Sequence, residues 1–242
     1  DYPPTISAHQ PWWRHNRLFE DFSARLCYFA SVGETVPEVC VLSPIESDYL
    51  EHASGRSEAR DNALEELLRT LLRTHRNFDL GDEQILSEIG TVADGRLVVG
   101  RMAYPVVVLP PMLTIRATTL ALLSRLAAQG GSVRVSGEYP SLVDGHDAPA
   151  ELSALRSFAP LVSPAEWTTA LARVARPFFT LAGQGSDQVW THLRKIAGGH
   201  SLQLTNTSRF ESRTLSLRFD GEPSVALHDP VNGRRLRLRL GR

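Results

Sequence analysis

Cysteine is scarce in this chain of 242 residues, which contains only Cys27 and Cys40. Both lie in or beside apolar stretches and far from any C-x-x-C spacing, so the pattern favours buried thiols over a disulfide or a pair of metal ligands. The cysteine content therefore assigns no compartment, and periplasmic, secreted and cytoplasmic locations all stay open.

The sequence also lacks a charge excess and a long apolar run. Its formal net charge is −1, which gives no global field to attract nucleic acid or an anionic membrane. No run of about 18 apolar residues indicates a membrane span, and Asp1 opens a polar, proline-containing stretch instead of a signal peptide. We expect no nucleic-acid partner and no membrane partner. A chain that begins without methionine is expected to be a processed or excised segment.

Phosphate-binding motifs are absent as well. The chain contains no G-x-G-x-x-G or Walker pattern, and the apolar runs at residues 39–42 and 106–109 are followed by Pro44 and by Pro110-Pro111. Proline has no backbone N–H to offer a phosphate. The sequence therefore argues against a nucleotide, and we expect no cofactor.

At the centre of the chain, the sequence predicts a strand, a helix and a second strand. Residues 106–109 form an unbroken β-branched and apolar run, as expected of a parallel strand covered on both faces. Thr114 can cap the helix that must follow, in which leucines recur at helical spacing over residues 120–126. Gly130-Gly131 ends this helix before a short strand at residues 132–136.

Strands and helices alternate over roughly residues 37–142, within a domain expected to span residues 37–160, and Asp94-Gly95 is the two-residue turn of a hairpin. This alternation predicts an α/β domain with an open, mostly parallel sheet and helices on both faces, of the flavodoxin-like or class I amidotransferase-like kind. Residues 143–159 are rich in Gly, Asp, Pro, Ala and Ser, and are predicted to form a linker or an exposed loop.

In class I glutamine amidotransferases, the same architecture carries a nucleophilic cysteine on the tight turn after a strand like residues 133–136. Gly137-Glu138-Tyr139 occupies that place here, and neither cysteine is near it. The scaffold resembles an amidotransferase without its triad.

The last part of the chain, residues 161–242, changes character. Ser163 and Glu166 form a capping-box pattern that opens a helix to about residue 175. Short strands separated by Gly, Asn, Asp and Pro turns follow, and several of them alternate polar and apolar residues. They are predicted at residues 178–181, 189–196, 201–206, 212–219, 225–228 and 234–240. We expect a smaller antiparallel, β-rich and sandwich-like domain.

Residues 1–36 combine an irregular start with a helix predicted over residues 18–31. Nothing before this helix supplies a sheet, so its apolar face needs another partner. His9, Trp12 and Trp13 are candidate substrate-binding residues, because indole rings beside imidazole and amide groups suit the C–H face and the hydroxyls of a sugar. The alternative is that both tryptophans pack against a neighbouring domain.

Three acidic residues, Asp79, Asp82 and Glu83, lie close together in the sequence. Asp79 and Glu83 are candidates for a general acid/base pair, and the group could instead bind calcium. The alternative is that Asp82 caps a helix and the other two are ordinary surface charges. The histidines of the β-rich part lack metal-ligand spacing, so no metal site is predicted there.

Several segments carry a family resemblance. They are PWWRHNRLFEDFSARLCYFASVGETVPEVCVL (residues 11–42), the stretch from FDLGDEQ to SGEYP (residues 78–140), LQLTNTS (residues 202–208) and LHDPVNGRRLRL (residues 227–238). Together they resemble the C-terminal part of large α-L-rhamnosidase-type glycoside hydrolases, family 106 and relatives. In that family the last elements of a barrel lead into an amidotransferase-like α/β domain and then a β-sandwich.

The resemblance implies a carbohydrate-active enzyme whose two catalytic carboxylates lie in a (β/α)₈ barrel, most of which is not in this chain. It implies that this chain is the non-catalytic C-terminal portion, with the upstream barrel as its partner. The rival interpretation is a stand-alone carbohydrate-binding or oligomerisation module that forms homo-oligomers. A third is a stand-alone hydrolase that uses Asp79 or Glu83.

Overall fold

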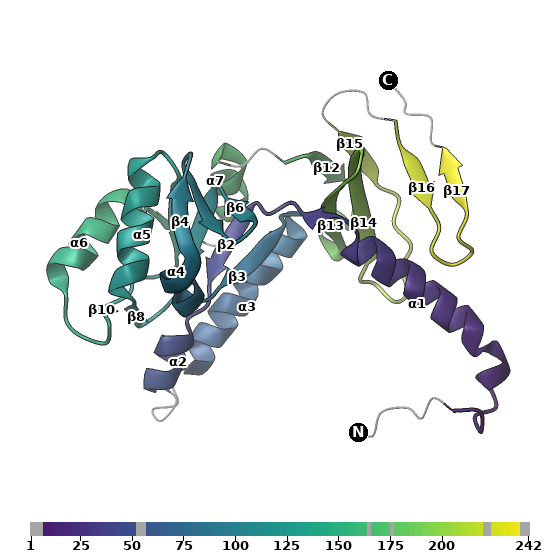
Figure 1. The fold of residues 1–242 in the computed structure, drawn as a ribbon, viewed down its shortest axis with the longest axis horizontal. Helices are drawn as coiled ribbons and strands as arrows, with labels where there is room; N and C mark the ends of the chain where they lie inside the picture. Colours follow the sequence, from purple (N-terminus) through teal and green to yellow (C-terminus); the bar gives the residue numbers. More distant parts are fainter. Residues whose placement is uncertain (1–6, 52–56, 164–165, 175–176, 220–223, 238–242) are drawn as a thin grey trace. The chain divides into compact units, whose positions relative to one another are not determined.

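The computed structural model describes residues 7–51, 57–163, 166–174, 177–219 and 224–237, which fold into two compact units (Figure 1). The larger unit comprises residues 36–191 and 204–217, and the smaller one residues 1–35, 192–203 and 218–242. Within the described ranges, no helix is both long and apolar enough to cross a membrane.

A five-stranded parallel sheet forms the centre of the larger unit, in the order β11-β9-β7-β2-β3. The chain order reverses between β2 and β7, which makes this pair the topological switch point of the sheet. The prediction of an open parallel sheet is confirmed. Its strands are β2 (Val39–Leu42), β3 (Phe78–Gly81), β7 (Val106–Leu109), β9 (Ser132–Ser136) and β11 (Leu161–Val162).

Helices cover both faces of this sheet, which explains why β2 and β7 are apolar at every position. On one face, α3 (Ser57–Arg73) and α7 (Trp167–Val174) pack through Leu67, Leu71 and Trp167. The other face contacts α4 (Glu83–Ile89), α5 (Ala117–Ala128) and α6 (Pro149–Phe158).

The hairpin at Asp94-Gly95 is confirmed. It joins β4 (Gly90–Ala93) to β5 (Arg96–Val99), and both turn residues have positive φ, as a type I′ turn requires. A third antiparallel strand, β6 (Met102–Tyr104), was not predicted. Its Tyr104 is buried, so this small sheet belongs to the same core as α5.

Two local predictions were wrong. The segment predicted as a linker contains α6, whose Leu152 and Leu155 are buried, because Pro149 starts a helix whose leucines then recur at helical spacing. Thr114 does not cap α5. It lies in the short strand β8 (Thr114–Ile115), which pairs with β10 (Leu142–Val143), and the N-cap residue of α5 is Arg116.

The rest of the chain forms small antiparallel sheets. The helix α1 (Asn16–Ser31) leads to β1 (Glu34–Thr35), which pairs with β13. One sheet has the order β1-β13-β14, and β12 pairs with β15 and β16 with β17. The strand bounds are β12 (Phe179–Ala182), β13 (Val189–Ile196), β14 (Gly199–Asn206), β15 (Ser216–Phe219), β16 (Ala226–His228) and β17 (Arg235–Arg237).

Parts of two predictions lie outside the described residues. The backbone N–H of Ser163 donates to Glu166 Oε2 over 3.2 Å, which is one of the two bonds of a capping box, whereas residues 164–165 and residue 175 are not described. The last positions of the strand predicted over residues 234–240, residues 238–240, are also outside the described ranges.

Burial of α5 predicts a large effect of truncating Leu123, which is fully buried in the core. We expect Leu123→Ala to lower the free energy of unfolding by about 2–5 kcal/mol, because it removes apolar contacts and leaves a cavity. Ser124→Ala, on the exposed face of the same helix, is the matched control and should stay within about 0.5 kcal/mol of wild type. Urea denaturation measures both, and equal effects would contradict the packing described.

Candidate functional site

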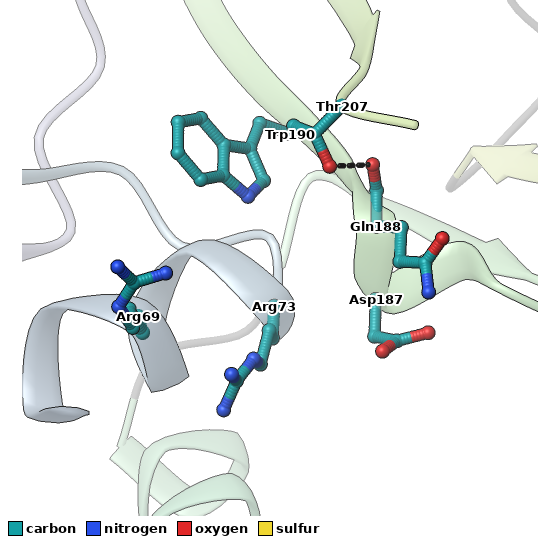
Figure 2. Close-up of a pocket in the computed structure, with 6 residues that line it drawn as sticks. All are labelled: Arg69, Arg73, Asp187, Gln188, Trp190 and Thr207. Carbon is teal, nitrogen blue, oxygen red and sulfur yellow. Dashed lines mark hydrogen bonds between the residues drawn. The ribbon is translucent and has the colours of Figure 1, made fainter. Parts of the chain in front are cut away.

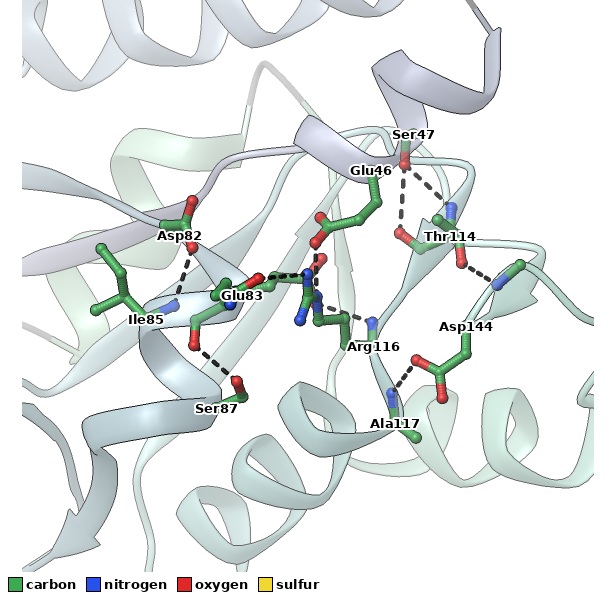
Figure 3. A network of polar contacts seen from close by, with 12 residues as sticks. Glu46, Ser47, Asp82, Glu83, Ile85, Ser87, Thr114, Arg116, Ala117 and Asp144 are labelled. Atoms are coloured by element: carbon green, nitrogen blue, oxygen red, sulfur yellow. Dashed lines mark hydrogen bonds and ion pairs between the residues drawn. The ribbon is translucent and has the colours of Figure 1, made fainter.

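In open α/β sheets, ligands bind at the carboxyl ends of the strands, beside the switch point. Here the segments that follow β2, β3 and β8 supply Glu46, Glu83 and Arg116 to one network of polar contacts (Figure 3). Glu46 lies in α2 (Ile45–Glu51), which begins directly after β2. The fold thus brings these side chains to its usual ligand-binding edge.

Glu83 is the buried member of this network. Its neighbour Asp82 caps α4 by accepting a hydrogen bond of 2.9 Å from the backbone N–H of Ile85. Glu83 itself is only 1% exposed. Its Oε1 accepts a hydrogen bond of 2.9 Å from the backbone N–H of Arg116, and its Oε2 has no hydrogen-bond partner within the described residues.

The environment of Glu83 favours its protonated form. Burial raises the pKa of this carboxyl to about 7 and outweighs the hydrogen bond from the Arg116 N–H and the nearby hydroxyl of Thr119, which act in the opposite direction. A carboxyl with this pKa has the proton affinity of a general acid. Because the side chain is closed off from solvent, however, a substrate cannot reach it in this conformation.

The guanidinium of Arg116 is already paired. Its Nε donates to Glu46 Oε1 over 2.6 Å, and its Nη2 donates to Gln84 Oε1 over 3.3 Å. The bond to Glu46 raises the pKa of Arg116, so the group stays charged. This cation is therefore neutralised within the protein.

The N-terminus of α5 is occupied in the same way. The backbone N–H of Arg116 donates to Glu83, and that of Ala117 donates to Asp144 Oδ1 over 3.0 Å. These first amides of a helix are the groups that an anionic ligand would otherwise use. The carboxyl groups of Glu83 and Asp144 hold these two amides, which are therefore not available to a ligand in this conformation.

The ends of the neighbouring strands β7 and β9 are also closed. Pro110 and Pro111, directly after β7, are buried. Gly137, after β9, has a φ of 75°, and a Cβ at this position would lie 3.2 Å from Pro111 Cγ. The turn resembles one that exposes a nucleophile, but Gly137-Glu138 provides no thiol or hydroxyl.

Neither cysteine supplies a reactive thiolate at this edge. Cys40 is buried on β2, and its burial, followed by the charge of Asp79, raises its pKa to about 12. The prediction that Cys27 is buried was wrong: this residue is exposed, and it lies on α1 in the smaller unit. Cysteine-based acyl transfer at the carboxyl edge has no candidate nucleophile among the described residues.

The three acidic residues singled out in the sequence are directed to three different partners. Asp79 accepts a hydrogen bond of 2.9 Å from the hydroxyl of Tyr104, Asp82 caps α4, and Glu83 holds Arg116. The three carboxyl groups therefore do not converge on one point. In the part of the chain that the structure describes, no group of three or more His, Cys, Asp or Glu side chains is placed to hold a metal ion.

The candidate sugar-binding residues of the N-terminus lie on the surface of the smaller unit. His9 is exposed, and Trp12 and Trp13 are 42% and 40% exposed. Backbone bonds from Trp13 N to Gln10 O and from His15 N to Trp12 O, of 3.0 and 2.8 Å, order this segment before α1. Both indoles are therefore available to a sugar or to another protein domain.

Comparisons with solved structures place this arrangement among known folds. A rhamnosidase from Novosphingobium sp. PP1Y superposes with a TM-score of 0.68 at 17% identity, over 97% of this chain and 23% of the other. A β-galactosidase from Bacillus circulans sp. alkalophilus gives a TM-score of 0.63 at 15% identity, over 96% and 43%. An exo-carrageenase from Bacteroides ovatus gives 0.56 at 12% identity, over 84% and 28%.

These structural neighbours are glycoside hydrolases. The chain spans between 23% and 43% of their lengths, so it shares the fold of one portion of each. No family model and no curated protein sequence matches the chain. The family resemblance in the sequence is therefore supported at the level of the fold, and the sugar specificity is not.

The burial of Glu83 predicts a pH-dependent stability. Because the pKa of about 7 in the folded protein exceeds the ordinary glutamate value of 4.5, the folded state holds a proton that the unfolded chain releases. This contribution is present at low pH and is lost as the pH rises through 7. We expect the free energy of unfolding to fall by about 2–3 kcal/mol from about pH 5 to about pH 8 from this group alone.

Glu83→Gln should remove this part of the pH dependence, because the amide cannot ionise but can still accept the Arg116 N–H. Glu88→Gln, on the exposed side of α4, is the matched control and should keep the wild-type slope. Urea denaturation at a series of pH values measures all three proteins. A slope unchanged by Glu83→Gln would show that this carboxyl is not the buried titrating group.

Proposed function

We propose that this chain is the non-catalytic C-terminal portion of a carbohydrate-active glycoside hydrolase of the α-L-rhamnosidase-like kind, and that it supports a catalytic barrel not present in this sequence. Its shared fold with portions of three glycoside hydrolases supports the general class. The rhamnosidase-like assignment rests on the sequence resemblance together with the similarity to the rhamnosidase.

One observation carries the proposal, and it is the exposure of large apolar side chains on α1. Leu18 and Phe19 are 72% and 62% exposed, Tyr28, on another side of the helix, is 61% exposed, and Asn16 is the only residue of this helix that is buried. Fully burying one large apolar side chain contributes about 1.5–3 kcal/mol, so this exposed apolar surface favours a protein partner. In our proposal this partner is the barrel that precedes the helix.

The polar network at the carboxyl edge supports a structural role for the larger unit. The strand order has the pattern of flavodoxin-like sheets, and Gly137-Glu138 stands at the position of the amidotransferase nucleophile. We therefore propose an amidotransferase-like scaffold that has no chemistry of its own. Glu83, which a stand-alone hydrolase would need, instead holds α5 in place.

The exposed Trp12 and Trp13 favour a second candidate, a carbohydrate-binding or oligomerisation module that acts without a barrel. Both candidates predict that the chain alone hydrolyses no aryl-glycosides. They differ in what covers α1: a barrel domain of the same polypeptide in the first, and a glycan or another copy of the chain in the second.

The test compares Phe19→Ser in two contexts: this chain alone, and the polypeptide encoded by the full reading frame. In the chain alone we expect a change of less than about 0.5 kcal/mol, because the side chain is exposed. In the longer polypeptide we expect a loss of about 1–3 kcal/mol, since the side chain is then buried against the barrel. Thermal unfolding measures both.

Arg17→Ser is the matched control, because the side chain of Arg17 is 89% exposed on the same helix. It should have little effect in either context. A full reading frame without a barrel-sized upstream sequence, or a Phe19→Ser effect no larger than that of Arg17→Ser in the longer polypeptide, would overturn the proposal.

A further inference from the structure

A small cavity in the larger unit shares no residue with the polar network at the carboxyl edge (Figure 2). Its volume is about 210 Å³. Two arginines of α3 form one side, and the segment around the 3₁₀ helix η4 (Ser186–Gln188) and the start of β13 forms the other. The lining residues are Arg69, Arg73, Asp187, Gln188, Trp190 and Thr207.

One contact outside the cavity joins its two sides, and two bonds between lining residues order one of these sides. The Nε2 of His75, just after α3, lies 2.9 Å from the backbone oxygen of Ser186, and its ring lies 6.4 Å from that of Phe179. The backbone N–H and the hydroxyl of Thr207 both donate to the backbone oxygen of Gln188, over 2.9 and 2.8 Å. The cavity is therefore preformed by contacts within the chain.

Trp190 supplies an exposed aromatic face. On β13, Val189 and Leu193 are buried, and Trp190 is directed outward with 40% of its surface exposed. Figure 2 shows its indole across the cavity from the helix that carries Arg69 and Arg73. An indole in this position can pack against the C–H face of a sugar ring.

Polar groups around the indole are free to take hydrogen bonds. The Nε of Arg69 donates to Glu65 over 2.9 Å and the Nη1 of Arg73 to Glu66 over 2.8 Å, which leaves Nη1 of Arg69 and Nη2 of Arg73 without a partner in the described part of the chain. The carboxylate of Asp187 has none there either. Planar donors and a carboxylate acceptor beside an aromatic ring suit hydroxyl groups.

The charge balance decides between a neutral and an anionic ligand. The two arginines are offset by Glu65 and Glu66, and Asp187 adds a further negative charge. No surplus of positive charge remains to hold a phosphate or a sulfate. The cavity is also smaller than the roughly 300–1,000 Å³ of pockets for drug-sized ligands, which limits the occupant to about one ring.

We propose that the Trp190 cavity binds one neutral pyranose ring of a glycan, with the indole against the ring's C–H face and Arg69, Arg73 and Asp187 bonded to its hydroxyls. This inference goes beyond the supporting role proposed above, because every residue of the site belongs to the larger unit of this chain. The proposed site therefore does not depend on whether a barrel precedes α1.

The test is a nuclear magnetic resonance titration of the chain with methyl glycosides of neutral hexoses and 6-deoxyhexoses, and separately with inorganic phosphate and sulfate. We expect at least one glycoside to shift the backbone amides of Gln188 and Thr207 with a millimolar Kd, and neither anion to do so. Trp190→Ala should weaken binding at least about tenfold, whereas Trp190→Phe, which keeps an aromatic face, should stay within about threefold.

Arg69→Ala should also weaken binding, and Arg125→Ala, an exposed arginine of another helix, is the matched control and should not. Because Trp190 and Arg69 are partly exposed, thermal unfolding should show that the variants remain folded. Three results would each overturn the proposal: no saturation by any glycoside up to about 20 mM, binding retained in Trp190→Ala, or phosphate or sulfate binding in place of the sugars.

Discussion

The hydrogen bond from the backbone N–H of Arg116 to the buried carboxyl of Glu83 is the constraint on which the carboxyl edge of the sheet depends. It joins the segment after β3 to the start of α5, and with the bond from Ala117 to Asp144 it fills the helix N-terminus. An edge that ligands use in open α/β sheets is thereby converted into an internal contact. The sheet keeps the architecture of a ligand-binding fold, but the first amides of α5 are bonded to side chains of the protein itself.

The bonded start of α5 and the exposed side chains of α1 both support the proposed structural role. The larger unit uses its acidic side chains for internal contacts, as Glu83, Asp82 and Asp79 each hold a different partner. The smaller unit leaves large apolar side chains of α1 exposed. In the function proposed above, both features belong to a portion that supports a larger enzyme. The Trp190 cavity adds a place where such a portion could contact the glycan itself.

Much of the central sheet follows from local sequence patterns. The unbroken apolar runs of β2 and β7 predicted strands covered on both faces, and Asp94-Gly95 predicted a hairpin turn; both are confirmed. The helix α6 was missed because Asp144, Gly145 and Asp147, together with Pro149, outweighed the spacing of Leu152 and Leu155. The loop-like composition of this segment hid the helical spacing of its leucines.

The candidate site was less predictable, because its contacts join distant segments. Glu83 was singled out as an acidic candidate, but its burial depends on Arg116, 33 residues further along the chain. Only the rule that polar residues after parallel strands share one edge could have grouped Glu46, Glu83 and Arg116. Trp190 belongs to no sequence motif that would have singled it out. Its cavity forms because η4 lies against α3, and these two elements are far apart in the sequence.

The most direct test of the closed carboxyl edge is the behaviour of the Arg116 backbone amide in solution. Hydrogen exchange should show this amide to be protected at neutral pH, and its chemical shift should not move when phosphate or a nucleotide is added at millimolar concentration. Protection reports the bond to Glu83, and an unmoved shift reports that no anion displaces it. Rapid exchange of this amide, or a saturable shift on adding an anion, would contradict the account.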